Sequence, residues 1–290
     1  MYHITVLKEE ICQYLVTKFD GVYIDVTAGG GGHSYALLEK YPHITLIACD
    51  WDFNAIKETE KRLAQFNDRV HIVHGSFSHI VENIKKTGYD FVDGIIADFG
   101  TSQHQLTHQE GFSFRYDSFL DMRMSVSHTK LLAVDILAHY SEKDLADIFY
   151  YYGQEKYSKK IARIIVEERK TRPIRTSLHL ANLISDSIGK KGPMHPATKI
   201  FQALRIAVNK ELEQIESFLY HVPSILNKGG RLACISFHSL EDGLVKQFYK
   251  NNKLNFEIVG PNKIILPSLQ EIRLNPAARS AKLRVLEKLI

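Results

Sequence analysis

Apolar residues in the first third of the chain occur as short continuous runs that alternate with segments of helical spacing. Short apolar runs predict buried strands, and apolar residues three and four positions apart predict amphipathic helices. We expect strands at 22–26, 45–49, 70–73 and 94–98, with helices between them at 34–40, 54–66 and 77–86. Such alternation predicts a mostly parallel sheet with helices on both faces.

The pattern changes after Asp98. Residues from about 105 to 195 contain no good strand but several helical patterns, at 131–140, 142–152, 154–169 and 178–188. The α/β pattern then resumes with a helix over 197–220 and strands at 231–237, 256–259 and 283–286. The sequence therefore predicts one α/β domain, formed by residues 1–104 and 197–290, and an inserted all-helical domain at 105–196.

Four glycines, Gly29 to Gly32, directly follow the first predicted strand, and a helical pattern begins just after them. A strand, a glycine turn and a helix bring bare backbone close to a nucleotide-like cofactor in open α/β sheets. Glycine suits this turn because it has no Cβ to block the turn or the ligand. Asp50, at the end of the second predicted strand, lies roughly 20 residues further on, where an acid binds ribose hydroxyls.

These residues leave the class of cofactor open between NAD and S-adenosylmethionine (SAM). A dinucleotide fold usually has a third glycine for close helix packing, but bulkier residues follow Gly32 here. SAM carries no pyrophosphate and does not need that packing. The two last strands are also predicted to form a hairpin-like pair, which is more typical of SAM methyltransferases. The pattern favours SAM, and a glycine turn without any ligand is the remaining alternative.

Composition excludes few functions. The chain has 290 residues, of which 44% are hydrophobic and 24% charged, as in an ordinary globular protein of one large or two modest domains. No apolar run approaches the roughly 18 residues that span a bilayer, and no signal peptide is visible. The three cysteines form no CxxC pair and are expected to be buried reduced thiols, which indicates the cytoplasm. No residue cluster has metal-ligand spacing, so we expect no metal.

Positive charge is concentrated in one predicted helical segment. The formal net charge of the chain is +4, but residues 156–175 contain eight bases against two acids. Such a run is either a solvated helix face or a phosphate-binding surface.

Motifs along nearly the whole chain resemble one family. The glycine loop at 27–34 is followed in order by matching stretches at 92–100, 111–114, 120–124, 152–157, 195–198, 201–206, 235–242 and 279–285. Leu-Asp-Met-Arg-Met at 120–124 and Ser-Phe-His-Ser-Leu-Glu-Asp at 236–242 are the most specific of them. The chain resembles the 16S rRNA cytosine-N4 methyltransferases (small subunit methyltransferase H, or MraW).

The resemblance implies a class I SAM-dependent methyltransferase fold, Rossmann-like with an antiparallel last strand, and an inserted helical domain. It implies SAM as donor and a cytidine in the decoding region of small-subunit rRNA as acceptor. Asp98 is the candidate catalytic carboxylate, with a helix cap as its alternative role. Phe77 is placed to cover the adenine, with a core aromatic as its alternative. The cofactor contacts carried over by position are Gly31, Gly32, His33, Asp50, Phe77, Asp98 and Gln105.

Candidate substrate contacts come from the later motifs. Because the target base must leave any stack, the RNA is expected to be single-stranded or flipped at that point. The candidates are Arg123, Asp121, His195, Ser236, His238 and Asp242. Arg123 has an ion pair with Asp121 or Asp117 as its alternative role, and the two histidines have structural hydrogen bonds as theirs. The expected partner is small-subunit rRNA or the small ribosomal subunit. A membrane partner is not expected, and a homodimer is one option for the assembly.

The chain departs from the family pattern at Gln103, Thr107, Gly243 and Ala277. Gly243 and Ala277 replace arginines, which predicts weaker or relocated RNA contacts. Three alternatives therefore accompany the main hypothesis: a SAM methyltransferase acting on another RNA or a protein, a dinucleotide oxidoreductase, and a catalytically silent RNA-binding protein.

Overall fold

The computed structural model describes residues 5–100, 110–189 and 194–290. The chain forms two compact units. The first contains Met1–Gly100 and Leu212–Ile290, and the second contains Thr101–Glu211. The second unit thus begins four residues before, and ends fifteen residues after, the predicted insertion at 105–196.

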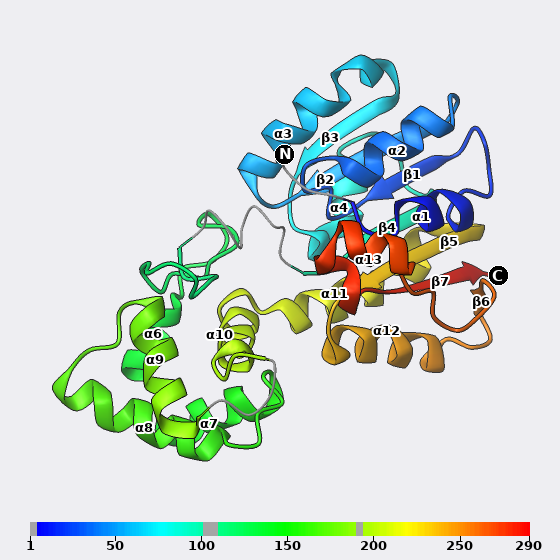
Figure 1. Ribbon diagram of the computed structural model, residues 1–290. Helices are drawn as coiled ribbons and strands as arrows, with labels where there is room; N and C mark the ends of the chain where they lie inside the picture. The colour runs from blue at the N-terminus through cyan, green and yellow to red at the C-terminus, as the bar shows by residue number, and fades with distance from the viewer. Residues whose placement is uncertain (1–4, 101–109, 190–193) are drawn as a thin grey trace. The chain divides into compact units, whose positions relative to one another are not determined.

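The first unit is built on a seven-stranded sheet with the order β3-β2-β1-β4-β5-β7-β6 (Figure 1). The pairings β1–β2, β1–β4, β2–β3 and β4–β5 are parallel, whereas β7 is antiparallel to β5 and β6. The predicted fold class and terminal hairpin-like pair are confirmed. The strands are β1 (Val22–Asp25), β2 (Thr45–Asp50), β3 (Val70–His74), β4 (Val92–Asp98), β5 (Leu226–Ser236), β6 (Phe256–Val259) and β7 (Lys282–Lys288).

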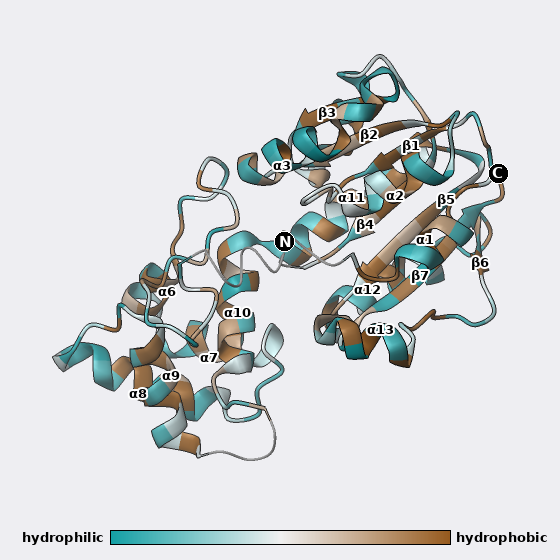
Figure 2. Ribbon diagram, turned by 45° about the horizontal axis from the view of Figure 1, so that its top comes forward, coloured by the Kyte–Doolittle hydropathy of each residue, from teal (hydrophilic) through white to brown (hydrophobic). Residues whose placement is uncertain are grey.

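Two apolar cores form because side chains alternate between the two faces of the sheet. Ile24 of β1 belongs to one core and its neighbour Tyr23 to the other. The first core contains residues of α4 (Ile80–Lys85), α11 (Glu211–Ile225) and α12 (Ser239–Asn251). The second contains residues of α1 (Lys8–Tyr14), α2 (Gly32–Lys40) and α3 (Phe53–Leu63). Figure 2 shows the apolar character of the central strands.

The second unit is helical and has its own core, which contains Phe149, Ile161 and Leu204. Its helices are α6 (Ala133–His139), α7 (Glu142–Tyr151), α8 (Ser158–Thr171), α9 (Ser177–Ile188) and α10 (Thr198–Asn209). The helix predicted at 142–152 is confirmed, and the Ser141 hydroxyl caps it by accepting from the Asp144 amide. Within the described residues, no helix is long and apolar enough to cross a membrane.

The prediction of one helix over 197–220 is wrong. The helix ends at Asn209, and Lys210 adopts a left-handed conformation with φ 49° before α11 begins. Asn209 is buried and bridges the backbone of Met122 and Met124, which holds the end of α10 inside the second unit. Long-range contacts of this kind override the helical periodicity of the sequence. Helices α1 and α12 and the short α13 (Leu269–Leu274) were not predicted.

Candidate functional site

The loop after β1 is held by the buried carboxyl of Asp25. This carboxyl accepts hydrogen bonds from the Thr27 amide (3.2 Å) and from the Ser34 hydroxyl (2.8 Å), so it joins the end of β1 to α2. The Thr27 hydroxyl accepts from the Asp98 amide at 2.7 Å, which fixes the loop to the end of β4. The ends of β1 and β4 and the start of α2 therefore form one rigid edge.

The glycines of the loop have distinct roles. Gly29 and Gly31 adopt φ values of 55° and 73°, which L side chains rarely adopt. Gly31 is the N-cap of α2. Gly32 has an ordinary φ, but an added Cβ there would collide with the Thr5 hydroxyl. Packing of the N-terminal segment therefore favours glycine at this position, and the role of Gly32 in the approach of a ligand stays a prediction.

Asp50 ends β2 beside this loop. Its two carboxyl oxygens accept from the amides of Gly29 (2.8 Å) and Asp52 (2.9 Å). Each oxygen keeps further lone pairs that can accept from hydroxyls of a ligand. Burial raises the pKa of Asp50 to about 7, although both backbone hydrogen bonds act in the opposite direction. The ribose contact expected for Asp50 stays a prediction, and the structure shows Asp50 at the end of β2 beside the glycine loop.

Asp98 ends β4, and its side chain is only 16% exposed. Its Oδ1 has no hydrogen-bond partner within the described residues. Its Oδ2 lies 3.9 Å from Nδ1 of His33. Burial raises the pKa of Asp98 well above its ordinary value, and the charges of Asp25 and Glu241 raise it further.

His33 is a neutral neighbour of Asp98. Its Nε2 lies 2.8 Å from the Val6 carbonyl and must carry the proton, because a carbonyl can only accept. Its Nδ1 therefore presents a lone pair toward Asp98. Burial lowers the pKa of His33 to about 4, so no positive charge offsets the Asp98 carboxyl from this side. His33 thus lies beside Asp98 but outside hydrogen-bond distance, and its expected contact with the cofactor stays a prediction.

Phe77 lies three residues after β3 and is partly buried. Its ring packs edge-on against Phe218 (5.9 Å between centroids) and near Phe99 (6.1 Å). The structure therefore shows the core packing that was the alternative role of Phe77. Part of the surface of Phe77 is exposed, so the predicted contact with adenine stays a prediction.

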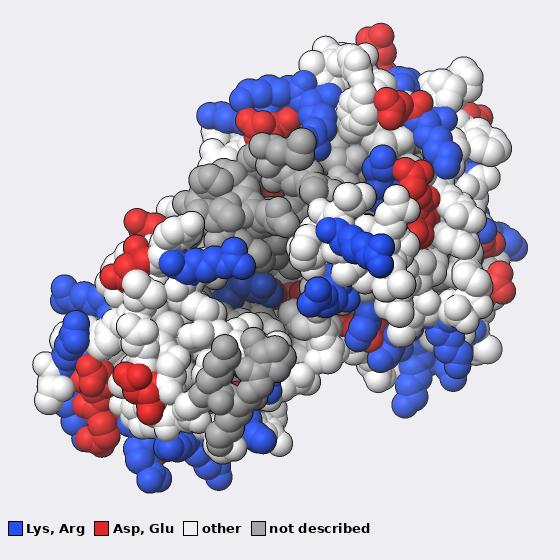
Figure 3. Space-filling view, viewed as in Figure 1, with Lys and Arg blue, Asp and Glu red and all other residues white. Residues whose placement is uncertain are grey.

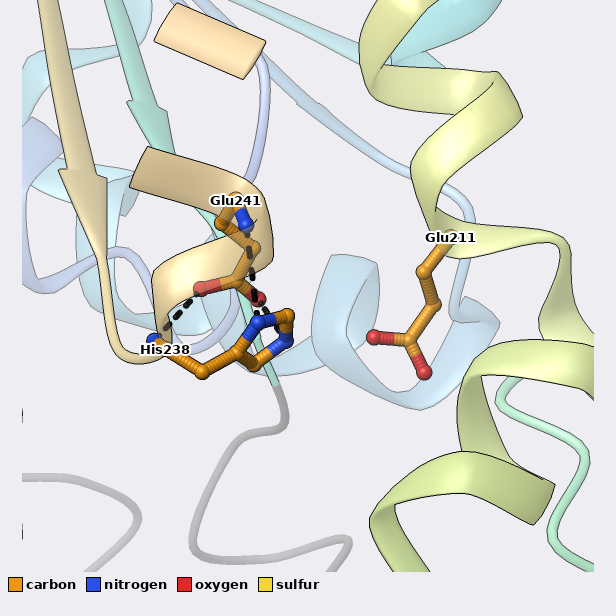
Figure 4. Close-up of side chains that lie close together, drawn as sticks. All are labelled: Glu211, His238 and Glu241. Atoms are coloured by element: carbon orange, nitrogen blue, oxygen red, sulfur yellow. Dashed lines mark hydrogen bonds and ion pairs between the residues drawn. The ribbon is translucent and has the colours of Figure 1, made fainter. Parts of the chain in front are cut away.

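His238 and Glu241 form a reciprocal cap at the start of α12 (Figure 4). Oε2 of Glu241 accepts from the amides of Phe237 (2.7 Å) and His238 (3.2 Å). Its Oε1 lies 2.9 Å from Nε2 of His238. The Glu241 amide donates to Nδ1 of His238 at 3.5 Å, so the imidazole has the structural hydrogen-bonding role that was the alternative for His238.

Glu241 was missed as a site residue, although its buried charge contributes to the raised pKa of Asp98. The motif around it contains a usable signal, because an acid three residues after a capping side chain marks a capping box.

Asp242 and Ser236 differ from their predicted roles. Asp242 is 1% exposed, and its carboxyl is occupied by Arg284 (2.6 Å) and Lys246 (2.8 Å). Ser236 is also 1% exposed and faces the Lys282 carbonyl. Both side chains are buried in the protein, so neither presents a free polar group to a substrate.

The remaining candidates lie in the second unit. Arg123 and Asp121 form a bidentate ion pair with two contacts of 2.8 Å, which is the alternative role of Arg123. His195 stacks near Phe114 with 4.5 Å between ring centroids and contacts the Ser185 hydroxyl at 3.3 Å. Gln105, Gln103 and Thr107 lie outside the described residues.

The basic segment 156–175 is partly used for structure. Arg169 donates to the Leu137 carbonyl, Lys160 donates to the Ser187 carbonyl, and Arg163 and Lys170 pair with acids. The interpretation of this segment as a phosphate-binding surface stays a prediction.

Three carboxyls therefore meet at the carboxyl ends of β1, β2 and β4: Asp25, Asp50 and Asp98. None of them pairs with a lysine or arginine in the part of the chain that the structure describes, and burial raises the pKa of each. Such a site stabilises a cationic ligand and repels a pyrophosphate. SAM fits it, because its sulfonium and ammonium groups make it cationic. Once bound, SAM supplies an electrophilic methyl group.

The fold and this site define a class I methyltransferase that uses SAM. The chain belongs to the MraW methylase family, whose model matches residues 1–289. The oxidoreductase alternative is therefore wrong.

Three relatives that share one name are similar to this chain over almost their whole length. The chain is 46% identical over 291 residues to the ribosomal RNA small subunit methyltransferase H of Acaryochloris marina, covering 99% of this chain and 94% of the relative. It is 44% identical over 292 residues to the protein of that name from Thermosipho africanus, covering 99% and 98%. The protein from Coprothermobacter proteolyticus is 41% identical over 292 residues, covering 99% and 96%.

The carboxyl cluster makes SAM binding depend on pH. The pKa of Asp25 is about 6 and that of Asp50 about 7 without the ligand, and a bound cation favours their ionised forms. Binding should therefore release protons, and the Kd for SAM should fall as the pH rises from 5 to 7, by at most about tenfold per pH unit for each proton released. Calorimetry in two buffers of different ionisation enthalpy measures both quantities. A Kd that stays constant over this range would contradict the expectation.

Proposed function

We propose that this protein transfers the methyl group of SAM to the N4 amine of a cytidine in the decoding region of small-subunit rRNA. The family match and the relatives named ribosomal RNA small subunit methyltransferase H support an rRNA substrate. The observation that carries the chemistry is the Oδ1 of Asp98, a buried acceptor with no partner among the described residues at the cofactor edge.

The chemistry needs a proton acceptor and in-line placement. Cytosine N4 is a poor nucleophile because its lone pair is delocalised into the ring. In the transfer, the bond between sulfur and the methyl carbon breaks, the bond between nitrogen and carbon forms, and sulfur becomes neutral. The amine then loses a proton, which an ionised Asp98 can accept. Placement supplies part of the rate, and a preorganised acceptor stabilises the positive charge on nitrogen.

An exocyclic amine fits this protein better than a ring carbon. Methylation at C5 of a pyrimidine requires an attacking thiolate. Cys49 and Cys234 are buried, and burial raises the pKa of both thiols far above the ordinary value. Burial also raises the pKa of Cys12, to about 11. None of the three cysteines is a thiolate at neutral pH.

We further propose that the second unit binds the RNA around the target base. His195 presents an aromatic ring next to Phe114, and aromatic rings are surfaces on which unpaired bases stack. Arg123 would then act by holding Asp121 and the surrounding loop, because its guanidinium is already engaged.

Nucleoside mass spectrometry of small-subunit rRNA tests the proposed function. Deleting the gene should remove N4-methylcytidine from this RNA, and expression of the wild-type chain should restore it. Expression of Asp98→Asn should not. If N4-methylcytidine persists in the deletion strain, the acceptor is another RNA or a protein, and the proposed substrate is wrong.

A further inference from the structure

A cavity of about 410 Å³ lies in the first unit, beside the second half of α12 and the strands β6 and β7. It involves none of the loop residues around Asp25, Asp50 and Asp98. Its wall contains four basic side chains and four aromatic or aliphatic ones. The lining residues are Lys246, Tyr249, Lys253, Ile258, Lys263, Ile264, Arg284 and Leu286.

The deepest charged group of this cavity is held in place by the protein. Arg284 is 8% exposed, and its Nε donates to Oδ1 of Asp242 at 2.6 Å. Its Nη1 donates to the Lys263 carbonyl at 2.8 Å. Lys246 reaches the other oxygen of Asp242 at 2.8 Å. The wall is therefore preformed, because a buried ion pair and a backbone contact fix the guanidinium.

The cavity has an excess of positive charge. Asp242 offsets one of the four bases, so about three positive charges remain. Lys253 and Lys263 are exposed and form no ion pair within the described residues. Figure 3 shows lysine and arginine side chains gathered on the lower right of this face, where Figure 1 places α12. Unpaired lysines at the mouth of a cavity attract an anion.

The apolar part of the lining indicates which kind of anion the cavity binds. A free phosphate ion would use the lysines but not Tyr249, Ile258 and Leu286. A nucleotide uses both, because its base stacks on an aromatic ring while its phosphate contacts lysine. Tyr249 is half-buried against the core, so its ring is held as such a platform.

We propose that this cavity is a subsite for one nucleotide of a single-stranded RNA segment next to the methylated base. The inference rests on the proposed function for the RNA nature of the substrate. Tyr249 lies eight residues along α12 from Glu241, which corresponds to about 12 Å of helix. A strand that enters the cofactor edge near Glu241 can therefore continue along α12 into the cavity.

Binding of a fluorescent single-stranded RNA to the full chain, followed by anisotropy, tests the subsite. The double variant Lys253→Ala/Lys263→Ala should bind about tenfold more weakly at low salt. Its plot of log Kd against log salt should be shallower by about 0.7, because one lost phosphate contact on a single strand contributes about that much. Tyr249→Ala should weaken binding at least about fivefold, and Tyr249→Phe should bind like the wild type.

A matched control separates the cavity from general charge. Lys85 and Lys228 are exposed lysines of the first unit that do not line the cavity, so Lys85→Ala/Lys228→Ala removes the same charge. This variant should change the Kd less than twofold. Equal losses in both double variants, or wild-type binding by Tyr249→Ala, would overturn the subsite. Fluorescence of Trp51 during urea unfolding verifies that each variant is folded.

The binding assay does not depend on methyl transfer, so the two proposals can fail separately. Persistent N4-methylcytidine in the deletion strain, with loss of RNA binding in the cavity variants, would defeat the proposed function alone. Loss of N4-methylcytidine in that strain, with unchanged RNA binding in the cavity variants, would defeat the subsite alone.

Discussion

Asp98→Asn is expected to lower the rate of methyl transfer at least a hundredfold without unfolding the protein. Asparagine keeps the shape of the side chain but cannot accept the amine proton or balance the charge of SAM. Loss of a single preorganised electrostatic group in a buried site costs about 10²–10³ in rate. The Asp98 amide can still donate to the Thr27 hydroxyl, so the loop should keep its conformation.

The same variant should be at least as stable as the wild type in the absence of SAM. Burial raises the pKa of Asp98 in the folded state above its unfolded value. A carboxyl of this kind stabilises the fold while it is protonated, and this stabilisation is lost as the pH rises from the unfolded pKa toward the folded one. Asparagine does not ionise, so any advantage of the variant in Tm should grow with pH. Site residues that cost stability are a common feature of functional sites.

Single-turnover methylation, SAM calorimetry and thermal unfolding together test the role of Asp98. Asp90→Asn is the control, because Asp90 is exposed and lies just before the other end of β4. The control should retain full turnover. Lost turnover with normal SAM binding would assign Asp98 to the transfer step, whereas lost SAM binding would assign it to the cofactor. Turnover within tenfold of the wild type would exclude both roles.

The local pattern of apolar and polar residues predicted the sheet well, together with the edge at which its parallel strands end. All seven strands were expected within a few residues of their observed positions, except that β5 begins five residues earlier than predicted. Apolar runs of this kind must be buried on both faces, so the fold follows from periodicity and alternation. The positions of Asp50 and Asp98 then follow, because each ends a parallel strand and such ends share one edge.

Side-chain pairing could not be predicted in the same way. The contact between Asp242 and Arg284 joins residues 42 positions apart on α12 and β7. The capping-box spacing marks Glu241, which lies beside His238 and influences Asp98, but nothing in the local sequence shows that Asp242 is buried against Arg284. The motif indicated the segment, but the predicted substrate contact fell on Asp242, which is buried against Arg284, and not on Glu241, whose charge raises the pKa of Asp98. Only the direction of each side chain in the folded unit decides between them.

The pairing of Asp242 leads to the largest expected effect on stability. Asp242→Ala should lower the free energy of unfolding of the first unit by about 3–5 kcal/mol, because it leaves the buried Arg284 guanidinium without its carboxylate. Burial raises the pKa of Asp242, but hydrogen bonds from Arg284 and Lys246 outweigh it and hold this pKa below the ordinary value. The stabilisation is therefore present above the unfolded pKa and is lost as the pH falls toward the folded one.

Urea unfolding followed by the fluorescence of Trp51, the only tryptophan of the chain, reports on the first unit. The double variant Asp242→Ala/Arg284→Met should recover most of the lost stability at neutral pH, because it removes both buried charges and fills the space with an apolar side chain. The double variant should also lose less stability than the wild type when the pH is lowered from 5 to 3. If the single and double variants unfold at the same urea concentration, the unpaired guanidinium does not cause the loss of stability. The loss then comes from the missing packing of the carboxyl group itself.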